Sequence, residues 1–128
     1  MKIYLAARFS RQAEMRGYAE QLERAGHEVT SRWIDPQDEQ AYEELTPAGC
    51  KKCAEHDVAD VLRADAIIAF TEPPEPNTSR GGRHVEFGIA IAAGNVLMIV
   101  GPRENVFHWL PEVNQFDSFT ACLVAIGR

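Results

Sequence analysis

Three short segments are apolar at nearly every position rather than at every second one: Lys2–Ala6, Asp65–Phe70 and Asn95–Val100. A strand of this kind is buried on both faces, as in parallel sheets that carry helices on each side. Each segment is far shorter than the roughly 18 apolar residues that cross a bilayer. These runs therefore restrict the chain to an α/β fold built around a parallel sheet.

Segments with a helical period separate these strands. In the first, apolar residues recur at spacings of three and four between Met15 and Ala25, which is the period of one helix face. Ser10 is placed to cap this helix, and Gly26 is placed to end it. The other helices are expected over Pro47–Arg63, over Gly82–Ala93, and from Asp117 or Ser118 to the C-terminus.

Two further strands are expected at His27–Trp33, where apolar and polar residues alternate, and at Val113–Phe116. The alternation of strands and helices predicts one domain over residues 1–128, with no internal repeat. The expected fold is a flavodoxin- or Rossmann-like three-layer α/β sandwich, with a five-stranded parallel sheet in the order 2-1-3-4-5. Ligands bind such sheets at the carboxyl ends of strands 1 and 3, where the order reverses.

The charge balance narrows the classes of partner. The chain has 13 Lys and Arg against 19 Asp and Glu, a net charge of −6, and this argues against binding a nucleic acid polymer. The N-terminus turns polar too early for a secretory signal, so we expect a cytoplasmic protein that has no membrane segment. Cys50 and Cys53 resemble half of a zinc or redox site, but no second pair follows, so no metal is predicted. We expect Cys53 to pack against its helix and Cys50 to be exposed.

Arginines gather in the two segments that reach the carboxyl edge of the sheet. Residues 6–11 read AARFSR, and residues 79–86 read SRGGRHVE. Glycines at a helix start let backbone N–H groups approach an anion, which the helix dipole and nearby guanidinium groups also favour. A phosphate group is therefore expected here, unless the arginines are merely solvated and the glycines form a turn. The residues expected to hold it are Arg8, Arg11, Arg80, Gly82 and Arg83.

A carboxylate is expected to face the same crevice from the helix that follows the glycines. Glu86 lies in its first turns, beside an apolar stripe that includes Val85 and Ile89. The helix dipole stabilises the carboxylate anion there, which suits a nucleophile. The alternative role is a glutamate that serves only the helix start.

A second carboxylate and a phenol add to this prediction. Asp57 lies among Ala54, Val58, Val61 and Leu62 on the expected apolar face of its helix, where a charge must be paired, hydrogen-bonded or functional. The alternative for Asp57 is a salt bridge to an arginine. Tyr4 lies in the middle of the first strand and orients a carboxylate, or is simply a core residue. Two carboxylates beside a phosphate pocket suggest a reaction at the glycosidic bond of a nucleotide.

The sequence resembles the nucleoside 2-deoxyribosyltransferase superfamily, near its 2′-deoxynucleoside 5′-monophosphate N-glycosidase branch. The matching pieces are MKIYLAARFS at the start, DVADVLRAD at residues 57–65 and RGGRHVEFGIA at residues 80–90. The resemblance implies that Glu86 is the nucleophile, that Asp57 handles the departing base and that Tyr4 orients Glu86. It also implies that no cofactor is needed.

The resemblance further implies a ligand loop and an oligomer. The loop residues it indicates are Ala6, Arg8, Phe9, Ser10 and Arg11. In the family a residue after the fourth strand reaches into a neighbouring subunit's site; here Asn105 or His108 is placed to do so, which implies a homodimer or a larger assembly. Transferases of free nucleosides carry an acid six residues before the nucleophile. Arg80 stands at that position here and favours a 5′-phosphorylated substrate.

Other functions remain as alternatives. One alternative is a nucleoside 2-deoxyribosyltransferase that exchanges bases. Another is a protein that binds a nucleotide without catalysis. A receiver domain needs an acidic cluster after the first strand and an aspartate at the end of the third, where this chain has Arg8 and Phe70. A flavodoxin needs a hydroxyl- and glycine-rich first loop, and residues 6–11 contain no glycine.

Overall fold

A computed structural model describes residues 1–36, 46–76 and 80–127. The strands are β1 (Lys2–Ala6), β2 (Glu28–Val29), β3 (Ala66–Phe70), β4 (Val96–Val100) and β5 (Val113–Phe116). The α-helices are α1 (Gln12–Arg24), α3 (Pro47–Arg63), α4 (Gly82–Ala92) and α5 (Phe119–Ile126). Three short 3-10 helices are η1 (Phe9–Arg11), η2 (Arg32–Ile34) and η3 (Val106–Trp109).

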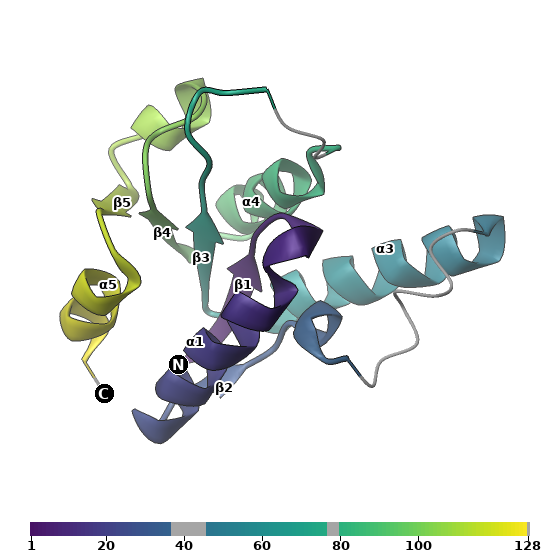
Figure 1. Ribbon diagram of the computed structural model, residues 1–128, viewed down its shortest axis with the longest axis horizontal. Coiled ribbons are helices and arrows are strands. Elements are labelled where there is room, and N and C mark those ends of the chain that lie inside the picture. The colour runs from purple at the N-terminus through teal and green to yellow at the C-terminus, as the bar shows by residue number, and fades with distance from the viewer. Residues whose placement is uncertain (37–45, 77–79, 128) are drawn as a thin grey trace.

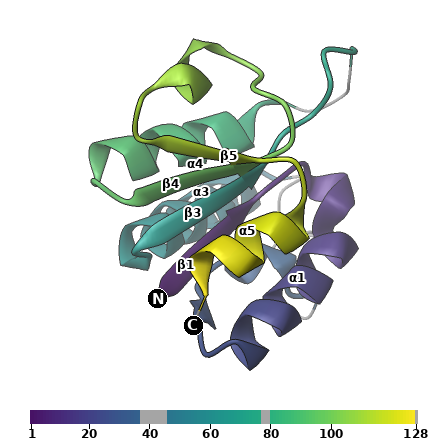
Figure 2. The same cartoon turned by 90° about the vertical axis from the view of Figure 1, so that its left-hand side faces the viewer.

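The strands form one parallel sheet in the order β2-β1-β3-β4-β5, which confirms the predicted topology. Helices α1 and α5 cover one face of the sheet, and α3 and α4 cover the other (Figures 1 and 2). This confirms the three-layer α/β sandwich. The carboxyl ends of β1, β3 and β4 therefore open toward the same edge, beside the start of α4.

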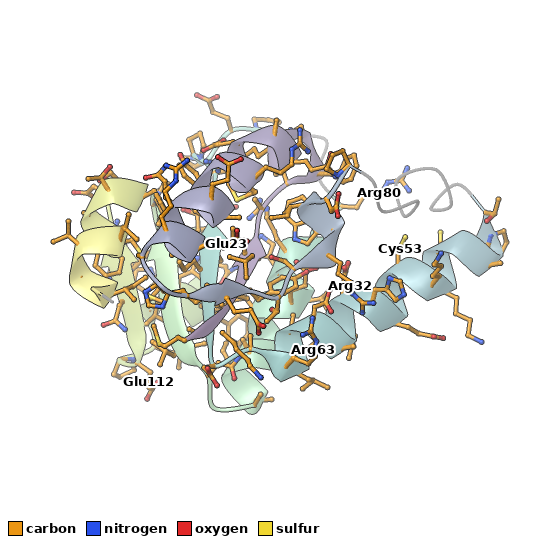
Figure 3. The ribbon with its side chains drawn as sticks, turned by 90° about the horizontal axis from the view of Figure 1, so that it is seen from below. Glu23, Arg32, Cys53, Arg63, Arg80 and Glu112 are labelled. Carbon is orange, nitrogen blue, oxygen red and sulfur yellow. The ribbon has the colours of Figure 1, made fainter. Side chains whose placement is uncertain are left out.

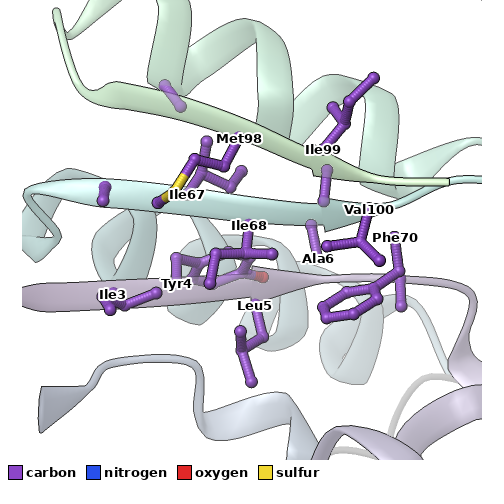
Figure 4. Close-up of a cluster of buried hydrophobic side chains, with 14 of the residues drawn as sticks. Ile3, Tyr4, Leu5, Ala6, Ile67, Ile68, Phe70, Met98, Ile99 and Val100 are labelled. Atoms are coloured by element: carbon purple, nitrogen blue, oxygen red, sulfur yellow. The ribbon is translucent and has the colours of Figure 1, made fainter. Parts of the chain in front are cut away.

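The core follows the three central strands. All five residues of β3 are buried, and four of the five in both β1 and β4. Tyr4 is fully buried within this layer, between the side chains of β1 and β3 (Figure 4). A phenol that takes part in the core is held rigidly, so its hydroxyl has a fixed position.

The second strand is much shorter than the alternating pattern at 27–33 predicts. It ends at Val29, because side chains from the following turn take over the hydrogen bonds of β1. Leu5 N–H donates to Ser31 Oγ at 3.1 Å, and Trp33 Nε1–H donates to the Leu5 carbonyl at 2.8 Å. The prediction of a strand over His27–Trp33 was therefore wrong beyond its first residues. On this side of β1, the N–H and carbonyl of Leu5 are therefore satisfied by side chains and not by a continued β2.

The apolar faces of two helices differ from the prediction by about one residue. On α3 the buried positions include Cys53, Asp60 and Val61, whereas Val58 and Leu62 are exposed, with Ala54. On α4 the buried positions are Arg83, Phe87 and Ala90, and Val85 is 65% exposed. The positions of apolar residues indicated the wrong buried face, because polar residues such as Asp60 on α3 and Arg83 on α4 occupy part of the face that is buried.

The helix ends largely follow their capping chemistry. Thr46 Oγ1 accepts a hydrogen bond from Gly49 N–H at 3.0 Å at the start of α3, and Ser118, not Asp117, caps α5. Ser10 was expected to cap the first helix but lies within η1, and Arg11 is the N-cap residue of α1. Cys50 is exposed and Cys53 is buried, as expected. Within the described ranges, no helix combines the length and apolar character needed to cross a membrane.

Candidate active site

A phenol and a carboxylate meet at the centre of the predicted site. Tyr4 Oη donates a hydrogen bond to Glu86 Oε2 at 2.5 Å, which joins the middle of β1 to α4. Burial and the neighbouring carboxylates, chiefly Glu86, raise the pKa of Tyr4 well above its usual value. The phenol therefore stays protonated and acts as a hydrogen-bond donor to Glu86.

Glu86 does not behave as a helix-stabilised anion. Its pKa is raised to about 8, first because burial penalises the charged form, and then because Asp57 lies beside it. Asp57 contributes both its charge and a side-chain hydrogen bond, while the bond from Tyr4 opposes the rise. The expectation that the helix dipole would keep Glu86 ionised was wrong, because desolvation outweighs the dipole.

Asp57 and Glu86 share a proton in this arrangement. Ionised carboxylates are acceptors only, so two carboxyl groups hydrogen-bond to each other only when one of them is protonated. A pair of this kind ionises in two coupled steps. The structure thus brings together Tyr4, Asp57 and Glu86, the three residues expected to be catalytic, with one proton available for transfer near neutral pH.

The expected phosphate-binding arginines are mostly engaged by carboxylates. Arg11 makes two 2.8 Å hydrogen bonds to Glu14 and one of 2.9 Å to Glu72. Arg83 is buried and forms a two-point ion pair with Glu104. These two guanidinium groups therefore tie the loops together rather than facing a ligand.

The remaining groups are better placed to receive an anion. Arg8 makes one 3.4 Å contact with Glu72, and Arg80 is exposed (Figure 3). Gly81 precedes α4 in the left-handed conformation, φ 83°, and supplies no side-chain cap, so the first N–H groups of α4 lack a side-chain acceptor there. Gly82, the first residue of α4, is exposed. Arg83 Nε is buried without a hydrogen-bond partner among the described residues.

The rest of the first loop lines the same edge. Ala6 is buried at the end of β1, whereas Phe9 and Ser10 are exposed in η1. The ring of Phe9 lies 6.3 Å from that of Trp33, which leaves an aromatic surface beside Arg8. The loop therefore offers apolar and polar contacts next to the carboxylate pair.

The two residues expected to reach a neighbouring subunit, His108 and Asn105, both make hydrogen bonds within their own chain. His108 is 2% exposed, accepts a hydrogen bond from Glu104 N–H and packs edge-on against Phe87. Asn105 caps η3 through Phe107 N–H and also lies 3.4 Å from His84 Nδ1. Both side chains are therefore held within their own chain by local hydrogen bonds.

Sequence reasoning missed one buried acid near the site. Asp60 is fully buried and accepts hydrogen bonds from Arg32 N–H and Nε at 3.0 Å and from Arg63 at 3.1 Å. Arg32 and Arg63, the last residue of α3, lie near each other in Figure 3, and both form salt bridges with Asp60. An arginine salt bridge of the kind considered for Asp57 is therefore made by Asp60, three residues later. Its spacing from Asp57, on the same helix face, is the signal that could have indicated it.

Two acidic residues in the connecting loops were also missed. Glu72 follows β3 and Glu104 follows β4, and the N–H of Glu72 donates to Glu104 at 3.0 Å. Nothing in the local sequence distinguishes them from solvent-exposed acids. Their partners come from distant segments, so only the fold reveals their role.

Solved structures with the same fold include proteins that act on glycosidic bonds. A 2-deoxyribosyltransferase of Bacillus psychrosaccharolyticus is 17% identical, with a TM-score of 0.67, over 95% of this chain and 90% of that one. The CMP N-glycosidase BcmB of Clostridium botulinum is 19% identical, with a TM-score of 0.61, over 98% of each chain. BlsM is 21% identical, with a TM-score of 0.60, over 94% of this chain and 83% of that one.

The sequence itself also carries a family assignment. No curated protein matches the chain. The model of the nucleoside 2-deoxyribosyltransferase family, however, matches residues 3–119, which is nearly the whole sequence. With the glycosyl-transferring and N-glycosidase folds above, this shows an enzyme of nucleoside or nucleotide glycosyl transfer or hydrolysis. The chain belongs to the nucleoside 2-deoxyribosyltransferase family.

Proposed function

We propose that this enzyme cleaves the N-glycosidic bond of a (2′-deoxy)nucleoside 5′-monophosphate and releases the free base. The observation that carries the proposal is the contact of Glu86 with both Tyr4 and Asp57 at the carboxyl edge of the sheet. A nucleophile, a proton donor and a positioning group are the parts that a double displacement at a glycosidic carbon requires.

The shared proton supplies the first chemical step. The proton, held on Glu86 before the reaction, passes to Asp57, and Asp57 gives it to the departing base as the bond from C1′ to the base nitrogen breaks. Glu86, left as a carboxylate, forms a bond from its oxygen to C1′ and becomes a glycosyl ester. Tyr4 keeps the attacking carboxylate in one orientation through its 2.5 Å hydrogen bond.

Water completes the cycle. Asp57, now ionised, accepts a proton from a water molecule as the oxygen of that water attacks C1′. The ester bond breaks, Glu86 leaves as a carboxylate, and the proton that Asp57 took from water is again shared between Asp57 and Glu86. Two displacements on the same carbon retain the configuration of the sugar. No metal or organic cofactor enters any step.

The 5′-phosphate is assigned to the start of α4. Arg8, Arg80 and the backbone N–H of Gly82 at the start of α4 offer positive charge and a donor on the open side of this edge. Arg83 is buried and bonds to Glu104, so it joins the start of α4 to the loop that follows β4. The CMP N-glycosidase among the structures of the same fold supports a monophosphate substrate.

A homodimer is part of the same proposal. Three large apolar side chains of η3 are exposed, Val106, Phe107 and Trp109, at 75%, 60% and 70%. Exposed apolar clusters of this kind mark protein interfaces. With Asn105 and His108 held within their own chain, these side chains are the ones that meet a partner subunit. Sedimentation of the wild type against Trp109→Ser tests this assignment.

A panel assay tests the reaction itself. The purified protein is incubated with the eight common ribo- and deoxynucleoside 5′-monophosphates and with the matching nucleosides, and free base is measured by chromatography. We expect base only from monophosphates, and none from Glu86→Gln. Base only from nucleosides would favour a base-exchanging transferase, and nucleotide binding without any product would favour a non-catalytic binding protein.

A further inference from the structure

We propose that Glu72 limits the preference for a phosphorylated substrate, because it holds Arg8 before substrate binds and must release it to the phosphate. This inference rests on the proposed function, since it assigns a residue to the phosphate end of that site. Glu72 does not touch the reacting atoms. It acts through Arg8 and is therefore a positioning and specificity residue.

Glu72 lies where three segments converge. It follows β3 by two residues, and its side chain is 12% exposed. Oε2 accepts a 2.9 Å hydrogen bond from Arg11, Oε1 accepts a 3.4 Å contact from Arg8, and the backbone N–H donates to Glu104. The carboxylate thus has one strong partner and one weak partner, and the backbone bond to Glu104 holds it in place.

The two arginines on Glu72 are held to very different degrees. Arg11 is fixed by Glu14 through Nε and one terminal nitrogen, and it also lies 5.4 Å from the ring centre of Phe70. Among the described residues, the side chain of Arg8 makes a 3.4 Å contact with Glu72, and it is 26% exposed. Arg8 is therefore the guanidinium that moves at the lowest cost.

The charges around this point are balanced before a substrate arrives. Arg8, Arg11 and Arg83 face three carboxylates, those of Glu14, Glu72 and Glu104. A phosphate dianion adds negative charge beside Glu72 and competes with it for Arg8. A nucleoside brings no such charge, so Arg8 stays on Glu72 and contributes nothing to its binding. Arg8 therefore favours the phosphorylated ligand, and the contact with Glu72 that must break reduces the size of this preference.

Neutralising Glu72 tests the exchange. Glu72→Gln keeps the shape and the acceptor oxygen but removes the charge that competes for Arg8. We expect inorganic phosphate and the monophosphate substrate to bind about three- to fivefold more tightly, because a half-exposed ion pair no longer has to break. Affinity for the parent nucleoside is expected to stay unchanged.

A double-mutant cycle with Arg8→Ala separates this effect from a general change in charge. In the Arg8→Ala background, the gain from Glu72→Gln is expected to fall below about twofold, because no guanidinium remains to be released. Glu14→Gln is the matched control, since it neutralises a carboxylate of the same network that bonds to Arg11 and Tyr18 rather than to Arg8. It is expected to leave phosphate affinity unchanged.

Affinities are measured by calorimetric titration in the Glu86→Gln background, so that no ligand is consumed. The probes are inorganic phosphate, the monophosphate that the panel identifies and its nucleoside. A Glu72→Gln variant that binds phosphate no more tightly, or that gains equally with and without Arg8, overturns the inference. If Glu72→Gln does not fold, Arg8→Ala alone decides: unchanged phosphate affinity overturns it.

The same titrations distinguish this inference from the proposed function. A wild-type site that binds the nucleoside as tightly as its monophosphate contradicts the proposed function, and the role of Glu72 is then overturned with it. A wild-type site that prefers the monophosphate, with no response to Glu72→Gln, leaves the proposed function intact and overturns the role of Glu72 alone.

Discussion

Tyr4 and Glu86 are 82 residues apart in the chain, and their side-chain oxygens lie 2.5 Å apart. The phenol comes from a fully buried position in β1, so its orientation is set by the packing of the sheet. The carboxylate comes from a helix on one face of that sheet. The position of the proposed nucleophile is therefore fixed by the core itself rather than by a loop.

Tyr4→Phe should slow the chemical step without weakening substrate binding. Loss of one hydrogen bond to a charged group corresponds to about 10- to 100-fold in kcat. Because the Tyr4 hydrogen bond lowers the pKa of Glu86, its removal should raise that pKa further. Steady-state kinetics across pH should show a lower kcat and an acid limb moved to higher pH. An unchanged pH profile would contradict the assigned contact.

Glu86 should make the protein less stable as pH rises. Its pKa is about 8 when folded and near 4.5 as a model carboxyl, so the folded state keeps a proton that the unfolded state loses between these values. Wild-type stability should then fall with pH in this window, by at most about 1.4 kcal/mol per pH unit from this group. Above about pH 8 no further loss is expected from it.

Glu86→Gln removes this dependence, because the amide does not ionise. Thermal unfolding of the variant and the wild type at pH 5 and pH 8 measures the effect. The free energy of unfolding of the variant minus that of the wild type should be about 1 to 3 kcal/mol higher at pH 8 than at pH 5. An equal difference at both pH values would show that Glu86 is not buried as a shared-proton partner of Asp57.

Asp57→Asn should have two effects: it removes the proton donor, and it lowers the pKa of Glu86. Both contributions of Asp57, its charge and its hydrogen bond, raise the pKa of Glu86. We expect kcat to fall by about 10²- to 10⁴-fold, the usual range for general acid catalysis. The loss should be smallest for substrates whose base leaves without protonation. Base release measured across such a series checks this, and a uniform loss would contradict the acid role.

Much of the fold was predictable because several elements carry their signals locally. Pro47–Arg63 was predicted with the bounds that the structure shows, and Thr46 and Ser118 supply side-chain caps. The strand order followed from buried strands that alternate with helices. The strand at 27–33 failed because Ser31 and Trp33 replace a strand partner through side chains, which the alternation of residue types does not reveal.

The candidate site was predictable where a residue conflicts with its surroundings. Tyr4 places a polar group at a core position, and the structure brings it to Glu86. Asp57 also meets Glu86, but it is half-buried, and most of the apolar neighbours that drew attention to it are exposed. The roles of the arginines were not predictable, because their partners Glu72 and Glu104 lie in distant loops. The pKa of Glu86 was not predictable either, because it depends on burial and on a neighbour 29 residues away in sequence.

Gly101→Ala should disturb the site from the carboxyl end of β4, where Gly101 meets Thr71. Gly101 has φ 116°, and a Cβ there would lie 2.5 Å from Thr71 Oγ1 and 3.2 Å from the Thr71 carbonyl oxygen. The substitution should cost about 1 to 3 kcal/mol of stability. It should also shift the loop that carries Glu104, and so weaken the ion pair between Glu104 and Arg83.

Gly17→Ala is the control, because Gly17 lies within α1 with open space around it. This substitution should stabilise the protein by about 0.5 to 1 kcal/mol. Chemical denaturation of both variants measures the difference, and equal stabilities would contradict the close approach of Gly101 to Thr71.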